Sequence, residues 1–205
     1  MTILLDPAIS FLENQFSWAE MGTEERRKRS FLAVSILVPV PFAVVYGLND
    51  LLSGRLLEGS VVIGVMLILM TNLLLLRIRE NTISHLRITA LLALMLLTNE
   101  LSLGGGEGNA FVWFYFFPIT MFYLFGTGEG SWWVAASITI SATFLVFDAG
   151  QFHYPATAAC RFMVTYLIVS IVSCAVECSR KRCYQALLEK SLVLEKALRQ
   201  RPPQA

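Results

Sequence analysis

Long apolar stretches separated by short charged ones make up most of this chain of 205 residues. A helix needs about 20 residues to cross the hydrocarbon core of a membrane. Six stretches approach that length. They are roughly Phe31–Leu48, Ser60–Leu76, Ile88–Leu103, Asn109–Phe125, Trp132–Phe147 and a last one from Arg161 past Cys178. The pattern predicts an all-α membrane protein with six transmembrane helices.

Lysine and arginine are distributed unequally between the two sides of this six-span arrangement. Basic groups precede the first span, join the second to the third and follow the sixth, at Arg26–Arg29, Arg77–Arg87 and Ser179–Arg182. The connections on the other side hold only Arg55 and Arg161. Because basic loops stay in the cytoplasm, both termini are expected to be cytoplasmic.

The charge pattern divides the chain into four parts. Residues 1–29 are expected to form a cytoplasmic amphipathic segment on the membrane surface, although a loosely packed tail is an equal alternative. Residues 30–178 form the six-helix domain, residues 179–201 a cytoplasmic helix, and residues 202–205 a tail or linker.

The last span continues into a charged helix that meets no helix breaker before Pro202. Beyond the basic residues, apolar and small side chains recur with alternating steps of three and four residues. This pattern is typical of the seam of a parallel coiled coil and predicts a homodimer. The alternative is an amphipathic helix resting on the membrane. The expected seam comprises Tyr184, Leu187, Ser191, Leu194 and Leu198.

Polar and ionisable residues collect on the side opposite the basic loops. Glu100 falls inside a span, where a carboxylate without a partner is costly, and Arg161 is its expected counter-ion. Aromatic residues of the fourth span could form an apolar wall below these groups. Alternatively, all of them mark the interface between membrane and water. The candidate ligand-binding residues are Glu100, Trp113, Tyr115, Phe116, Asp148, His153 and Arg161.

Several functional classes have no support in this sequence. A net charge of +1 offers no basic field for nucleic acid. His85 and His153 are expected on opposite sides of the membrane, so they cannot hold a haem together. The cysteines read as packing residues, and no metal-ligand or catalytic motif is present. We expect no enzyme activity, no cofactor and no metal.

The six spans, the turn "GGGEG", the stretch "FVWFYFFPITMFYLFGTGEGSWW" and a last span that runs into a charged helix resemble the membrane-associated sensor (MASE-like) domains of bacterial signalling proteins. The resemblance covers about Ser30–Arg199. It implies a dimeric sensor in the bacterial inner membrane whose last helix leads to a diguanylate cyclase or a histidine kinase. We see no GG(D/E)EF stretch and no kinase histidine motif here, so the output domain is expected to be absent from this chain.

The residues and the resemblance together predict a sensory input domain. It would bind a small apolar or amphipathic ligand, such as a fatty-acid-like or quorum-type molecule, in the outer half of the bundle and among membrane lipid. Two other interpretations stay open. The bundle could be a passive dimerising anchor, or it could be a small transporter.

Overall fold

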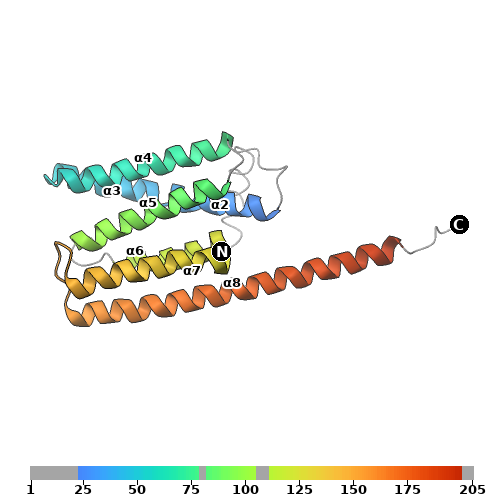
Figure 1. Ribbon diagram of the computed structural model, residues 1–205. Helices are drawn as coiled ribbons and strands as arrows, with labels where there is room; N and C mark the ends of the chain where they lie inside the picture. Colours follow the sequence, from blue (N-terminus) through green and yellow to red (C-terminus); the bar gives the residue numbers. More distant parts are fainter. Residues whose placement is uncertain (1–22, 79–81, 105–110, 200–205) are drawn as a thin grey trace.

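The computed structural model describes residues 23–78, 82–104 and 111–199, with side chains for 25–76, 82–104 and 111–192. These residues form helices joined by short turns, without strands, which confirms the all-α prediction. The helices are α2 (Thr23–Leu37), α3 (Pro39–Leu52), α4 (Leu56–Ile78), α5 (Thr82–Leu103), α6 (Phe111–Phe114), α7 (Phe116–Phe147) and α8 (Ala156–Arg199). Helices that follow one another in the chain pack together, and α8 projects well beyond the bundle (Figure 1).

Five helical segments in the described part of the chain are long and apolar enough to cross a membrane, not the six that we expected. They are Glu25–Leu52, Leu56–Leu76, Thr82–Leu103, Phe111–Phe147 and Ala156–Leu192. The difference lies in the fourth segment, which contains both the fourth and the fifth expected spans.

The segment Phe111–Phe147 is bent at Gly126, whose φ of 73° and ψ of −171° are not helical. Phe114 and Phe144, from its two arms, belong to one apolar cluster. In a straight helix they would be about 45 Å apart, at 1.5 Å per residue. The chain therefore reverses near Gly126. The first arm measures about 22 Å at that rise, less than the hydrocarbon core, so it is not a full-length span.

Arg29 joins three helices at the end of the bundle where α2 begins. Its side chain is only 1% exposed. The guanidinium donates to the carbonyl of Leu76 near the end of α4 (3.2 Å), to the Thr82 hydroxyl at the start of α5 (2.7 Å) and to Glu25 (3.0 Å). A helix leaves its last four carbonyls without partners, and Arg29 supplies a donor to one of them. Residues 1–22 of the expected surface segment lie outside the described residues.

A buried polar group also joins α4 to α5. The Asn72 amide donates to the His85 carbonyl (3.0 Å) and to the Thr89 hydroxyl (2.9 Å), and its oxygen lies 2.7 Å from Nδ1 of His85. His85 is therefore a buried residue of α5, not the loop residue that we expected. Hydrogen bonds of this kind hold helices together where no water can satisfy polar groups.

The reversal at Gly126 gives a direct test of the fold. We expect Gly126→Ala to lower the free energy of unfolding by about 1–3 kcal/mol, because only glycine readily adopts this backbone conformation. A Cβ atom there would also lie 2.5 Å from Nζ of Lys181. Gly128→Ala is the matched control, since its Cβ would meet nothing within 4 Å. Thermal unfolding in detergent measures both, and equal melting temperatures would contradict a reversal fixed by Gly126.

Candidate functional site

The two ends of the bundle differ in charge. The basic end holds Arg26–Arg29, Arg87, Arg180–Arg182 and the Gly126 turn. The acidic end holds Asp50, Glu58, Glu100 and Asp148. In Figure 1 the turns that join α3 to α4 and α7 to α8 lie together at the acidic end, on the side away from the projecting part of α8. The candidate ligand-binding residues lie at or near this end.

Three carboxylates share one arginine at the acidic end. Arg55 pairs with Asp50 at 2.6 Å and with Glu58 at 3.4 Å. Glu100 of α5 interacts electrostatically with all three of these residues. The cation beside Glu100 is thus Arg55. Arg161 is exposed on α8, and the ion pairs among the described residues do not include the expected pair between Glu100 and Arg161.

The turn between α7 and α8 is fastened to the end of α5. The Ser102 carbonyl accepts hydrogen bonds from the backbone nitrogens of Gln151 (2.8 Å) and Phe152 (3.0 Å). The Tyr154 hydroxyl donates to the Leu101 carbonyl at 3.0 Å. Burial, with a smaller contribution from the negative charge of Glu100, raises the pKa of Tyr154 to about 12. The phenol therefore stays protonated and remains a donor throughout the physiological range.

Asp148 and His153, two of the candidate residues, lie beside each other at the surface. Nδ1 of His153 lies 3.3 Å from a carboxylate oxygen of Asp148, and both side chains are exposed. Asp148 ends α7 with a left-handed backbone (φ 51°), and the turn bends back towards α8 at this point. An exposed pair of this kind contributes little to stability and is open to water or to lipid headgroups.

The aromatic side chains that pack inside the bundle are not the ones that we expected to form the apolar wall. Trp113 is 47% exposed and Phe116 is 60% exposed, so both face outwards. Tyr115 is half-buried, with its ring 5.9 Å from that of Phe162. The buried neighbour is Phe114, whose ring meets that of Phe162 edge to face at 5.6 Å. Trp113 and Phe116 share one helix face because they are three residues apart, and that face lies away from the packed cluster.

A second polar group, which the sequence did not lead us to expect, lies where α8 leaves the bundle. We call Arg27, Tyr123, Glu177 and Arg180 the exit joint. The Tyr123 ring has the guanidinium carbon of Arg27 at 4.8 Å from its centre and that of Arg180 at 5.7 Å. Glu177 is 3% exposed and accepts two hydrogen bonds from Arg180, at 2.6 and 2.7 Å. The one signal in the sequence was Glu177 itself, a lone acid that follows a long apolar run.

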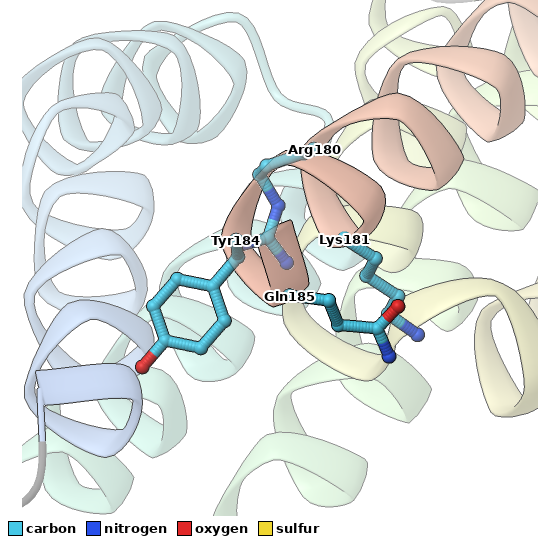
Figure 2. Close-up of a pocket in the computed structure, with 4 residues that line it drawn as sticks. All are labelled: Arg180, Lys181, Tyr184 and Gln185. Atoms are coloured by element: carbon cyan, nitrogen blue, oxygen red, sulfur yellow. The ribbon is translucent and has the colours of Figure 1, made fainter. Parts of the chain in front are cut away.

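A small hollow of about 130 Å³ adjoins the exit joint. Figure 2 shows the side chains that line it, Arg180, Lys181, Tyr184 and Gln185, fanning out from neighbouring turns of α8. It is not at the expected ligand site. Of the expected seam residues, Tyr184 lines this hollow, and Leu187 and Ser191 are exposed just beyond it. The helix extends to Arg199 and includes Leu194 and Leu198, whose side chains lie outside the described residues.

Comparison with known proteins gives one match. Residues 23–187 match the model of the MASE6 family, one of the families of membrane-associated sensor domains. No curated protein matches the chain, and no solved structure does. Among the described residues, no group of three or more histidine, cysteine, aspartate or glutamate side chains could hold a metal ion.

Tyr154 tests how the acidic end is held together. We expect Tyr154→Phe to lower the free energy of unfolding by about 0.5–1.5 kcal/mol, because the Leu101 carbonyl loses its donor. The phenol contributes its full stabilisation below pH 10, its ordinary pKa, and loses it as the pH rises towards 12.

Tyr46→Phe is the control for this substitution, since Tyr46 is exposed. Unfolding curves of both variants at neutral pH and above pH 10 measure the effect. A loss of equal size for both variants at neutral pH would contradict the role given to the Tyr154 hydroxyl.

Proposed function

Because the chain belongs to the MASE6 family of membrane-associated sensor domains, we propose that it is the sensory input domain of a bacterial signalling protein. It resides in the inner membrane and acts as a homodimer. It receives a signal at the acidic end of the bundle and passes it along α8 to a cytoplasmic output domain, a diguanylate cyclase or a histidine kinase.

The observation that carries this proposal is the continuity of α8. The helix runs for 44 residues from Ala156 to Arg199 without a break. Its first part packs on α7, and its last part projects from the bundle (Figure 1). A single helix with one part in the bundle and another outside it converts a change in packing into a movement of the projecting part.

The basic end is the cytoplasmic end in this proposal. It collects most of the lysine and arginine residues near the helix ends, as the positive-inside rule requires. The reversal at Gly126 lies at the same end, so the segment Phe111–Phe147 enters and leaves the membrane from the acidic side. Both termini are then cytoplasmic.

We propose that the signal is a small apolar or amphipathic molecule that arrives through the lipid. Trp113 and Phe116 face outwards, where lipid would lie, and they offer it an apolar surface. Arg55 and Glu100, at the same end, offer partners for a polar head. Arg55 is half exposed, it pairs with Asp50 and Glu58, and its charge also acts on Glu100, so a bound head group would change how these charges are paired.

Two alternatives would use the same architecture. A passive anchor needs the dimerising helix but no input at the acidic end, so Glu100→Gln and Arg161→Ala would leave the activity of an attached output domain unchanged. A transporter needs polar groups near the middle of the membrane. The charged groups described above favour a sensor over a transporter because they gather at the two ends.

The native cysteines test the orientation of α8. Cys160 and Cys183 are both exposed, one near each end of its membrane-spanning part. In variants that keep only one of the two, we expect a membrane-impermeant maleimide to label Cys160 on intact spheroplasts. Cys183 should react only after lysis. Labelling of both cysteines on intact spheroplasts would contradict a membrane-spanning α8.

Native mass spectrometry of the purified chain tests the proposed input. We expect a dimer that carries a defined small apolar or amphipathic molecule, and a roughly tenfold lower occupancy in Glu100→Gln, since a hydrogen bond to a charged group is lost. Glu189→Gln on the projecting helix is the matched control and should keep full occupancy. A dimer with only bulk phospholipid would favour the anchor, and a monomer would exclude signalling through a coil.

A further inference from the structure

The apolar stripe on the projecting part of α8 lies on the same helix face that packs on α7 inside the bundle. Within the bundle this face carries Tyr166 and Ser170, both buried. An α-helix repeats its direction every 3.6 residues, so Tyr184 lies five whole turns after Tyr166 and points the same way. Leu188 stands in the same relation to Ser170. We call Tyr184, Leu187, Leu188 and Ser191 the stripe.

The stripe also continues the buried face of α8 if the helix is treated as supercoiled, as in a coiled coil. If the alternating steps of three and four residues are continued backwards from Tyr184, as in a coiled coil, they reach Arg180, Glu177, Ser173, Ser170 and Tyr166. Tyr166, Ser170 and Glu177 are buried in the bundle. The side of α8 turned away from α7 carries exposed apolar residues instead, including Val164, Ile168 and Ile171. That side does not continue into the stripe.

If α8 is straight, the face that packs on α7 cannot also pack on the α8 of a second copy at the same height in the bundle. In a parallel coil the partner's axis would lie about 8–10 Å away, opposite the stripe. If both helices stayed straight, the partner's α8 would have to enter the bundle where α7 lies. That place is filled: the Ser137 hydroxyl of α7 lies 2.6 Å from the Tyr166 hydroxyl of α8. A coil through the stripe therefore requires α8 to turn or bend between Glu177 and Tyr184.

The exit joint lies where that movement must happen. Arg180 is attached to Glu177 by two hydrogen bonds and rests on the Tyr123 ring, which Arg27 of α2 also contacts. The Tyr123 ring also stacks on Phe31 of α2, with 4.0 Å between ring centres. On the next turn, Lys181 packs against the Gly126 reversal. These contacts fix the rotation of α8 relative to both α2 and α7.

We propose that the exit joint is a latch that holds α8 in the one orientation in which its stripe cannot pair with a second copy of the chain. Opening the latch is the step that allows the two stripes to form a parallel coil. The inference rests on the proposed sensory function, because it assumes that the chain is a dimer. It adds to that function the place where the signal must act, which is the exit joint.

Cysteine crosslinking in membranes tests the latch. In the full chain with its four native cysteines replaced by serine, Leu187→Cys places a thiol on the stripe, and Ala186→Cys places one on another face as the matched control. We expect little disulfide-linked dimer at position 187 in the parent. Tyr123→Leu should increase it roughly fivefold or more, since each cation–π contact is worth about 1 kcal/mol. Position 186 should show no increase.

Two further variants distinguish an opened latch from a misfolded protein. Tyr123→Phe keeps the ring face that the cations contact, so it should crosslink like the parent. Glu177→Gln keeps the shape of the side chain but removes the charge opposite Arg180, and it should crosslink like Tyr123→Leu. An increase in both opening variants, with none in Tyr123→Phe, would support the latch.

Native mass spectrometry of the same samples separates the possible failures. Dimers that crosslink at position 187 as strongly in the parent as in Tyr123→Leu would overturn the latch and leave the proposed sensor standing. Dimers that never crosslink at position 187 would overturn it as well. Monomers in every variant would remove the proposed dimer, and the latch with it.

Discussion

The bundle depends on one buried positive charge. Arg29 is almost fully enclosed, and Glu25, Leu76 and Thr82 supply acceptors for its guanidinium. These partners come from the end of α4 and the start of α5, so Arg29 fixes the position of α2 against the turn between them. Arg27 lies two residues earlier on the same helix, and its place over Tyr123 follows from that attachment. The exit joint is thus built on the position that Arg29 gives to α2.

The remaining polar groups of the bundle fall into two kinds. Those buried between helices, such as Asn72 with His85 and Ser137 with Tyr166, are paired across helices and hold the helices together. Those at the ends share partners unequally. At the acidic end, one arginine serves three carboxylates, and at the exit joint one tyrosine ring serves two guanidinium groups. Groups that share partners can be rearranged at less cost than groups that are fully paired.

The sequence predicted the helices well because their apolar runs are long and end at charges. It could not give the number of crossings. The reversal at Gly126 appears in the sequence as one glycine among several, and only its backbone angles distinguish it. The last helix was predicted as continuous, and α8 is continuous.

The orientation of side chains was harder to predict than the helices. Trp113 and Phe114 are adjacent and equally apolar, yet one is exposed and the other fully buried. A helix that is apolar on every side has no polar face to reveal its direction. The sequence was no better at predicting which charged residues, far apart in the chain, lie beside each other. Arg55 rather than Arg161 accompanies Glu100, because the short turn after α3 brings it to the end of α5.

Because α8 is unbroken, the number of residues between the bundle and the stripe determines the direction in which the stripe points. While α8 stays straight between Glu177 and Tyr184, every residue added there would turn the stripe by about 100° relative to the bundle. Two added residues would point it to the opposite side, whereas seven would nearly restore it. Side chains of this short segment that take no part in the exit joint or in the contact with Gly126 could therefore be exchanged freely. The number of residues could change only in whole heptads without giving the domain a different resting state.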